Sequence, residues 1–279
     1  MDNWLLLNES QLRLGFFLSM LILMASLEGF LPRRQDHNNA FGKLRLRRWF
    51  NNLSLITLSS LVIKILLPLS LVNFAILCQK SGWGLLNQGD LSHLFPAFGS
   101  VMLSLFLFDL IIYWQHRVFH QVPWLWKFHQ VHHSDNAIDV TTGIRFHPIE
   151  ILLSVGVKFA AIFLFGFSAV SIILFEILLN VLALFNHSNV RIPLRLDKLI
   201  RLFIVTPDMH RVHHSCKADE HNRNFGFNIS VWDRIFGSYQ EQPNLGHDDM
   251  IIGLNKFAST DQPNRISKLL LMPFKPVEK

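Results

Sequence analysis

The sequence predicts an all-α integral membrane protein with four to five membrane helices and a cytoplasmic helical cap that carries clustered histidines. Half of the 279 residues are apolar and only 16% are charged, whereas about a quarter of the residues of a soluble domain carry charge. Long apolar stretches recur as far as residue 186, and strand signals are weak. Eight of the fourteen histidines fall into three compact motifs that follow these stretches.

The N-terminal part predicts two membrane spans around a basic loop. Residues 13–31 contain an uncharged run from Leu14 to Leu27, which is short for a span of about 20 residues. Six cations follow within residues 33–48, and the positive-inside rule places such a loop in the cytoplasm. They are Arg33, Arg34, Lys43, Arg45, Arg47 and Arg48. Because the cations cluster beside apolar spans, the net charge of +6 favours a membrane surface over nucleic acid as the partner.

The second span is expected from Leu53 to Cys78, with Lys64 and Pro68 inside it, and the third from about Phe95 to Tyr113. The third returns the chain to the cytoplasmic side directly before the first histidine motif. If all three motifs serve one site, the chain must cross the membrane an even number of times between His133 and His210. Residues 149–166 and 169–186 satisfy this either as two short spans or as a helical hairpin, with Gly166-Phe-Ser168 between them.

Three regions are therefore predicted. Residues 1–80 form a two-span segment with the basic loop, residues 81–240 a histidine-motif catalytic domain, and residues 241–279 a cytoplasmic tail.

Two of the spans carry polar residues at helical spacing. Asp109, Tyr113, His116 and His120 share one face of the third span, and Glu176, Asn180 and His187 share one face of the last. Ionisable residues inside a membrane are functional candidates. Asp109 and Glu176 either support metal-binding histidines or join helices by hydrogen bonds, and the sequence leaves both open.

The motifs have the spacing of metal ligands on helices. They read His116-x-x-x-His120, His129-x-x-His132-His133 and His210-x-x-His213-His214. Histidines three or four positions apart lie on one helix face, so each of the two longer motifs should present three rings on one face. Imidazole suits zinc, copper, iron and nickel. Eight imidazoles exceed the four ligands of one zinc ion, which favours a two-metal centre.

Flanking residues support helices beneath the motifs. Thr206-Pro207 has the form of a helix start before His210. Pro123 separates the first two motifs into two helical segments, and Ser134 begins a turn after the second.

The ordered set of motifs resembles the fatty acid hydroxylase/sterol desaturase superfamily of integral-membrane di-iron enzymes. The resemblance covers roughly residues 83–240. It rests on Gly82-Trp-Gly-Leu-Leu86, Asp109 to His120, Pro123-Trp-Leu-Trp126, His129 to His133, Arg145-Phe-His-Pro148, Asn186-His187, Thr206-Pro207 with His210 to His214, Asn224-Phe-Gly226 and Trp232-Asp-Arg-Ile-Phe-Gly237.

The resemblance implies nine metal ligands: His116, His120, His129, His132, His133, His187, His210, His213 and His214. Asp109, His147, Glu176 and Asn180 are expected to support these ligands. His221 is expected in an exposed loop, and His37, His93 and His247 at the surface.

The resemblance further implies an oxidoreductase that hydroxylates or desaturates a membrane lipid. It would use two iron ions, which zinc can replace in purified protein, with dioxygen as co-substrate and electrons from a separate partner protein. The motifs would face the cytoplasm, in a bacterial inner membrane or the endoplasmic reticulum. Two other functions stay open: a lipid-binding scaffold with structural zinc, and a two-metal lipid hydrolase. The oligomeric state is not predicted.

Overall fold

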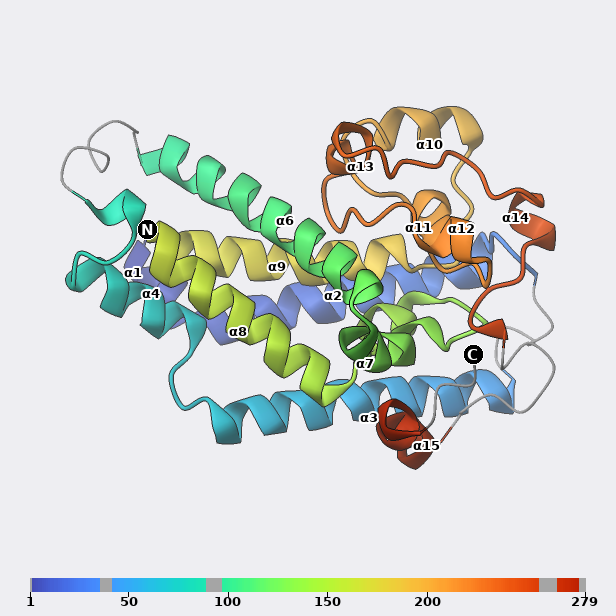
Figure 1. Cartoon of the computed structure of the whole chain (residues 1–279), viewed down its shortest axis with the longest axis horizontal. Helices are drawn as coiled ribbons and strands as arrows, with labels where there is room; N and C mark the ends of the chain where they lie inside the picture. Colours follow the sequence, from blue (N-terminus) through green and yellow to red (C-terminus); the bar gives the residue numbers. More distant parts are fainter. Residues whose placement is uncertain (1, 36–41, 89–96, 256–264, 276–279) are drawn as a thin grey trace.

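The computed structural model describes residues 2–35, 42–88, 97–255 and 265–275, and the regular elements of these ranges are helices, with three isolated β-bridges. Five helical stretches are long and apolar enough to cross a membrane. They run along the long axis of the molecule (Figure 1). The prediction of an all-α integral membrane protein is confirmed.

The first span is longer than its uncharged run. A short helix, α1 (Asp2–Leu7), precedes α2 (Glu9–Phe30). The 22 residues of α2 rise about 33 Å, enough to cross the apolar layer. The helix includes Arg13, whose charge is neutralised by Glu176 of α9 at 3.0 Å.

The second apolar run does not form one continuous helix. It divides into α3 (Lys43–Leu66) and α4 (Leu71–Lys80). Pro68 lies in the break, because proline lacks the N–H that a continuing helix needs and its ring clashes with the preceding turn. The Ser70 hydroxyl accepts a hydrogen bond from the Asn73 N–H at 3.1 Å and starts α4. Lys64 is exposed on α3.

Residues 148–186 form a splayed helical hairpin, in which α8 (Pro148–Phe165) and α9 (Ala169–Asn186) diverge from the turn between them and α4 packs against both (Figure 1). Gly166 ends α8 with a φ of 74°, a conformation that glycine adopts without strain. Gly84, before η1 (Leu85–Asn87), lies directly against this turn. A Cβ atom at Gly84 would come within 2.2 Å of the Gly166 nitrogen. The Gly82-Trp-Gly segment therefore closes over the hairpin turn.

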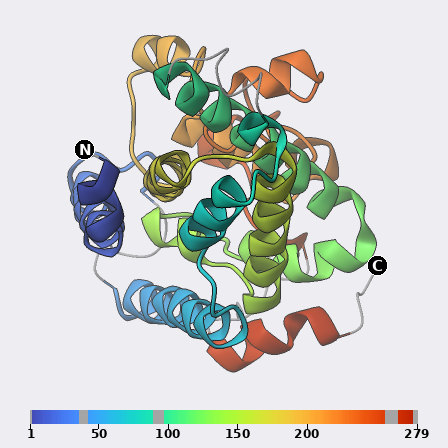
Figure 2. The same cartoon turned by 90° about the vertical axis from the view of Figure 1, so that its left-hand side faces the viewer.

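The third span, α6 (Ala97–Gln121), continues without interruption through the first histidine motif. It packs with α4, α8 and α9 around an apolar core that includes Phe108, Ile162, Ile173 and Phe175. The end-on view in Figure 2 shows these helices as a bundle, with α2 and α3 at its edge. The chain thus returns to the same end of the bundle before each histidine motif.

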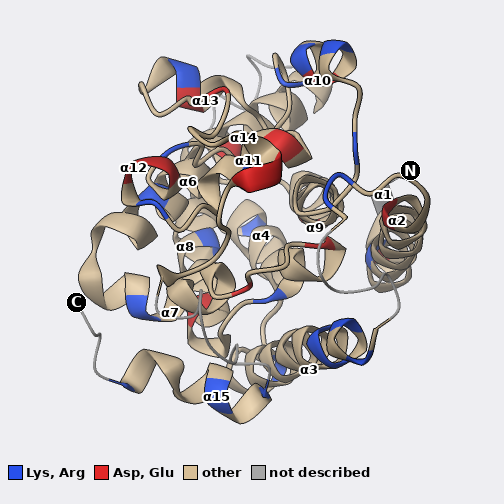
Figure 3. Cartoon of the chain, turned by 90° about the vertical axis from the view of Figure 1, so that its right-hand side faces the viewer, with Lys and Arg blue, Asp and Glu red and all other residues tan. Residues whose placement is uncertain are grey.

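Short helices form the cap at that end (Figure 1). Figure 3 views the molecule from the cap side, where α10, α11, α13 and α14 lie above α9 and α12 lies further to the left. The cap elements are α7 (Pro123–His133), η2 (Val140–Ile144), α10 (Leu194–Ile200), α11 (Pro207–His213), α12 (Ala218–His221), α13 (Val231–Ile235), α14 (Gly246–Asp249), α15 (Ile266–Leu271) and η4 (Met272–Phe274). Within the last region, Leu269 of α15 is fully buried against Leu55 of α3 and Val131 of α7.

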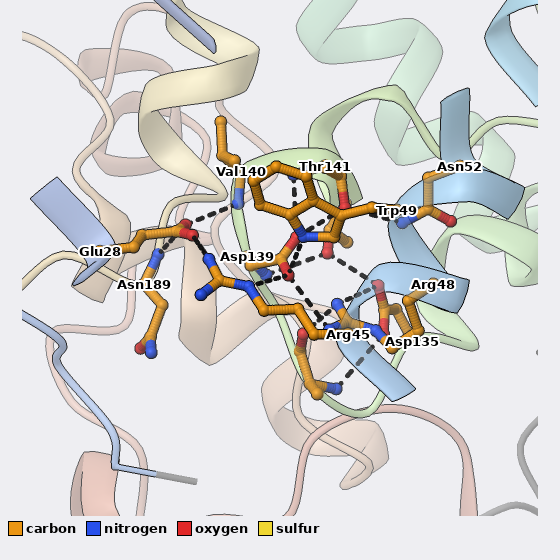
Figure 4. Close-up of polar contacts among 12 residues, drawn as sticks. Glu28, Arg45, Arg48, Trp49, Asn52, Asp135, Asp139, Val140, Thr141 and Asn189 are labelled. Atoms are coloured by element: carbon orange, nitrogen blue, oxygen red, sulfur yellow. Dashed lines mark hydrogen bonds and ion pairs between the residues drawn. The ribbon is translucent and has the colours of Figure 1, made fainter. Parts of the chain in front are cut away.

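Residues 33–48, predicted as a basic loop, include the first two turns of α3, and their cations contribute to a buried polar network rather than serving only at a membrane surface (Figure 4). Arg48 binds Asp135 and Asp139, which follow the second histidine motif. Arg45 binds Glu28 at the end of α2 at 2.6 Å. Arg33 likewise pairs with Asp208 of α11 at 3.2 Å. These cations join the first two spans to the cap.

Candidate metal centre

Two helices that meet at a proline carry the first two motifs. His116 and His120 lie one turn apart on α6, which ends at Gln121. Pro123 is the first residue of α7, and Ser134 caps the other end of that helix, as predicted. The bend folds α7 back on α6, and the rings of His116 and His129 come within 5.0 Å of each other.

The third motif lies on α11, whose start is fixed by the predicted cap. The Thr206 hydroxyl accepts a hydrogen bond from the Met209 N–H at 3.3 Å, and Pro207 occupies the first turn. His187 is the residue that caps the C-terminus of α9. Its ring centroid lies 4.3 Å from that of His210. The end of the last span therefore lies beside the third motif.

The nine predicted ligands come together in two neighbouring groups. Within each group, one potential ligand atom per residue lies within 4.8 Å of all the others. Nitrogens that share one ion are at most about 4 Å apart, because each metal–nitrogen bond is about 2.0–2.1 Å. The first group is His116, His120, His129, His133 and His213, and the second is His132, His187, His210 and His214.

Each His-x-x-His-His motif divides between the two groups instead of presenting three rings to one site. His129 and His133 join the first group while His132 joins the second. The third motif divides in the opposite sense, since His210 and His214 join the second group and His213 the first. The rings of His133 and His214 stack at 4.4 Å between centroids, at the boundary of the groups. The two motifs thus interlock.

Backbone carbonyls orient several of the rings. The Nδ1 atoms of His116, His187 and His213 lie 2.8, 2.7 and 2.7 Å from the carbonyl oxygens of Phe225, Ala183 and Arg223. A carbonyl oxygen only accepts hydrogen bonds, so each Nδ1 carries the proton. In the neutral ring the Nε2 lone pair then remains free for a metal ion.

His129 is supported by a carboxylate that the sequence reasoning missed. Its Nδ1 lies 2.6 Å from Oε1 of Glu150, in the first turn of α8. A histidine that donates to a carboxylate in this way is a common partner of a metal ion. The signal in the sequence is Glu150, two residues after Arg145-Phe-His-Pro148, but spacing alone does not reveal which histidine it contacts.

The ring nitrogens that have no carbonyl or carboxylate partner are arranged as ligands of a cation. Nε2 of His129, His133 and His213 is buried and has no hydrogen-bond partner among the described residues. In the second group, Nε2 of His187 lies 3.0 Å from Nε2 of both His132 and His210. Buried unpaired nitrogens cost free energy, whereas a metal ion among them would accept their lone pairs. The described histidines therefore fit a metal centre.

Burial favours the neutral, unprotonated form of these histidines. Desolvation lowers the pKa of His129 to about 3 and that of His187 to about 3. The pKa values of His132, His210 and His214 are also lowered, first by burial and then by neighbouring histidines. Neutral imidazole is the form that binds metal.

Asp109, His147, Glu176 and Asn180 are expected to support the ligands, but their hydrogen bonds among the described residues go to groups other than the nine histidines. Asp109 accepts from the Trp232 indole at 2.8 Å and the Ile229 N–H at 3.1 Å, which ties the cap to α6. Glu176 pairs with Lys158 at 2.6 Å and with Arg13. Asn180 donates to the Glu176 carbonyl. His147 caps α8, and its Nε2 lies 3.2 Å from the Leu270 carbonyl oxygen. The helix-joining alternative thus describes Asp109 and Glu176 better.

Two further histidines differ from expectation. His247 is buried beside Asp208, with Nε2 3.7 Å from the carboxylate, so the prediction of a surface position is wrong. His221 is half-buried and stacks on Trp126 at 5.5 Å between centroids, close to His120. His37 and His93 lie outside the described residues.

A family model described as fatty acid hydroxylase matches residues 101–238, the stretch that holds all nine histidines. The chain belongs to the fatty acid hydroxylase/sterol desaturase superfamily. The match confirms the resemblance drawn from the motifs. It extends from α6 to just beyond α13, so α2 and α3 lie outside it.

Curated proteins of the same superfamily are similar to about half of this chain. An ornithine lipid hydroxylase of Rhizobium tropici is 31% identical over 155 residues, which are 56% of this chain and 46% of that protein. Human alkylglycerol monooxygenase is 27% identical over 161 residues, 57% of this chain and 34% of that protein. Human cholesterol 25-hydroxylase is 26% identical over 144 residues, half of each chain.

The matches thus span half or less of the length of these curated relatives. No solved structure matches the chain significantly.

Proposed function

We propose that this protein oxidises a C–H bond of a membrane lipid with dioxygen, giving an alcohol or an alkene, at a centre of two iron ions. One observation carries the proposal: nine clustered imidazoles, nearly all fully buried, converge in two adjacent groups at one end of a membrane bundle. Neither group includes a carboxylate among the described residues. The names of the relatives, which are hydroxylases and monooxygenases of lipids, support the same reaction class.

In this proposal His116, His120, His129, His133 and His213 hold one ion, and His132, His187, His210 and His214 the other. When bound, the iron pair supplies the redox chemistry with dioxygen, and an external donor protein supplies electrons. Glu150 and the backbone carbonyls keep each ring in one orientation. Burial of the nitrogens keeps bulk water from the reacting groups.

The residues of the bundle bring the substrate to this centre. The helices expose many large apolar side chains outward, including Phe98 and Phe106 of α6, as a lipid-facing surface requires. A lipid can therefore approach the cap end of the bundle without leaving the membrane.

We infer that the histidines face the cytoplasm. Two of the six cations of residues 33–48 follow α2 and four lie in the first two turns of α3, at the cap end (Figure 1). The positive-inside rule places such a basic segment on the cytoplasmic side.

The test is a lipid comparison in cells that express the protein. Lipid extracts from cells with the wild-type chain and with His213→Ala are compared by mass spectrometry, with Lys198→Ala on exposed α10 as the control. Wild type and the control should yield a lipid that has gained one oxygen or lost two hydrogens, and His213→Ala should not.

Experiments on the purified protein distinguish the proposed function from the two alternatives, a scaffold with structural zinc and a lipid hydrolase. Iron in the protein and oxygen uptake with a chemical reductant and the identified lipid would support the proposal. Two tightly bound zinc ions without turnover after iron reconstitution would indicate a scaffold, and lipid turnover without oxygen would indicate a hydrolase.

A further inference from the structure

A polar cavity of about 350 Å³ lies beside the first histidine group. It is bounded by the end of α6 on one side and by the segments around α12 and α13 on the other. Its lining residues are Arg117, His120, Gln121, Asn222, Arg223, Phe225, Gly237 and Ser238. Two guanidinium groups and one predicted metal ligand therefore share a single cavity.

Neither guanidinium forms an ion pair with a carboxylate among the described residues. Arg117 donates through Nη1 to the Tyr113 hydroxyl at 3.2 Å and to the Phe236 carbonyl at 3.4 Å. Arg223 donates through Nη1 to the Gly237 carbonyl at 3.0 Å. Each contact orients its guanidinium but leaves other N–H groups and the full positive charge available.

Other arginines near the cap behave differently. Arg33, Arg48 and Arg211 each pair with at least one aspartate. Arg234 of α13 also forms no ion pair among the described residues, but it donates to the Ser230 and Arg201 carbonyls, lies over the Tyr239 ring and does not line the cavity. Two cations without a protein counter-ion favour an anionic ligand between them, since arginine binds carboxylate and phosphate through parallel hydrogen bonds.

His120 connects the cavity to the metal centre. Both of its ring nitrogens are buried and lack a hydrogen-bond partner among the described residues. By contrast, His116, His129 and His213 of the same group each have Nδ1 bound to a protein oxygen. If one nitrogen of His120 binds metal, the other lacks the acceptor that these ligands have.

The position of the cavity suits a lipid at the membrane surface. The Arg117 guanidinium lies over the ring of Trp114, 5.3 Å from its centroid. Trp114 is 42% exposed, at the end of the apolar span, where tryptophan commonly marks the interface between lipid and water. A headgroup in the cavity would leave its acyl chain free to follow the apolar surface of α6.

We propose that this cavity binds the anionic headgroup, a carboxylate or a phosphate ester, of the lipid on which the protein acts. The identification of that lipid as the substrate rests on the proposed function, whereas the binding itself does not. Because His120 lines the cavity and belongs to the first group, the oxidised carbon would lie near the headgroup end of the chain.

Equilibrium binding to the detergent-solubilised full chain, loaded with iron and kept without oxygen or reductant, tests the proposal. The probes are oleic acid, a lysophosphatidic acid with an oleoyl chain, the neutral monooleoylglycerol and inorganic phosphate. At least one of the two anionic lipids should bind about tenfold or more tightly than the neutral lipid. Inorganic phosphate should compete only at far higher concentration.

Arg117→Gln and Arg223→Gln should each weaken binding of that anionic lipid by about tenfold or more. The control Arg195→Gln, on exposed α10, should bind as wild type does. Arg223→Gln retains the main-chain carbonyl that accepts from His213, and its iron content is measured to confirm that the centre is intact.

Equal affinity for the anionic and neutral lipids, or unchanged affinity in both arginine variants, would overturn the headgroup site. Tight binding of inorganic phosphate alone would also overturn it, in favour of a free anion. Binding as expected without any later oxidation of the lipid would contradict only the proposed function.

Discussion

Arg48 and Asp135, 87 positions apart in the chain, are joined by two parallel hydrogen bonds of 2.9 Å from Nε to Oδ1 and from Nη2 to Oδ2. Asp135 follows His133 by two residues, so this pair anchors the turn after the second motif to α3. Burial raises the pKa of Asp135, but the charges of Arg48 and Arg145 outweigh this and lower it to about 2. The carboxylate is therefore ionised and dependent on its partners.

We expect Arg48→Gln to lower the free energy of unfolding by about 3–5 kcal/mol, because it leaves a buried carboxylate without its main counter-charge. Thermal unfolding in detergent measures the change, with Arg47→Gln, an exposed neighbour, as the control. The double variant with Asp135→Asn should lose less than the sum of the two single losses. Strictly additive losses would mean that the pair does not interact.

Glu150 should determine how tightly the first group holds its metal. Glu150→Gln removes the charge that orients His129, so iron affinity should fall by about 10- to 100-fold. Competition with a coloured chelator measures this affinity, and Glu241→Gln, whose side chain is largely exposed, serves as the control. Unchanged affinity would show that the 2.6 Å contact has no role in metal binding.

The division of the motifs predicts an unusual pattern of metal loss in double variants. His132→Ala with His210→Ala removes two ligands of the second group only, so about one ion per chain should remain. His132→Ala with His133→Ala removes one ligand from each group, so less than one should remain. Metal content by mass spectrometry distinguishes them. The reverse order would mean that each motif serves a single ion.

The close approach of Gly84 to the hairpin turn predicts a large effect of one methyl group. Gly84→Ala should destabilise the protein by about 2–5 kcal/mol, because the added Cβ would overlap the Gly166 backbone. In addition, Gly84 has a φ of 91°, which alanine adopts only with strain. Gly156→Ala, where nothing lies within 4 Å of the added atom, should be neutral or stabilising. Thermal unfolding compares them, and equal melting temperatures would refute the close contact.

Much of the architecture follows from the sequence because its causes are local. Apolar runs of span length, the basic loop, Pro123 between two helices and the Thr206-Pro207 cap all act within a few residues. The parity of the crossings also follows, since motifs that share one site must lie at one end of the bundle. These local signals brought the eight motif histidines together as candidate ligands, and the resemblance to the superfamily added His187.

What the sequence did not reveal depends on contacts between distant segments. The sequence predicts one span with Pro68 inside it, whereas α3 ends before Pro68, because proline inside a membrane helix can either kink the helix or end it. His247 was expected at the surface because nothing near it in sequence indicates the buried contact with Asp208. Asp109 was expected near the ligands, but its partner Trp232 lies 123 positions away.

The sequence by itself determined the fold class, the membrane character, the superfamily resemblance and the set of candidate ligands, because periodicity and spacing encode these within single helices. Only the tertiary structure decided how the two His-x-x-His-His motifs divide between two groups, and that Glu150 rather than Asp109 meets a ligand. The physical reason is that the direction of a ring depends on the helix packed against it, and spacing along one helix carries no information about that neighbour.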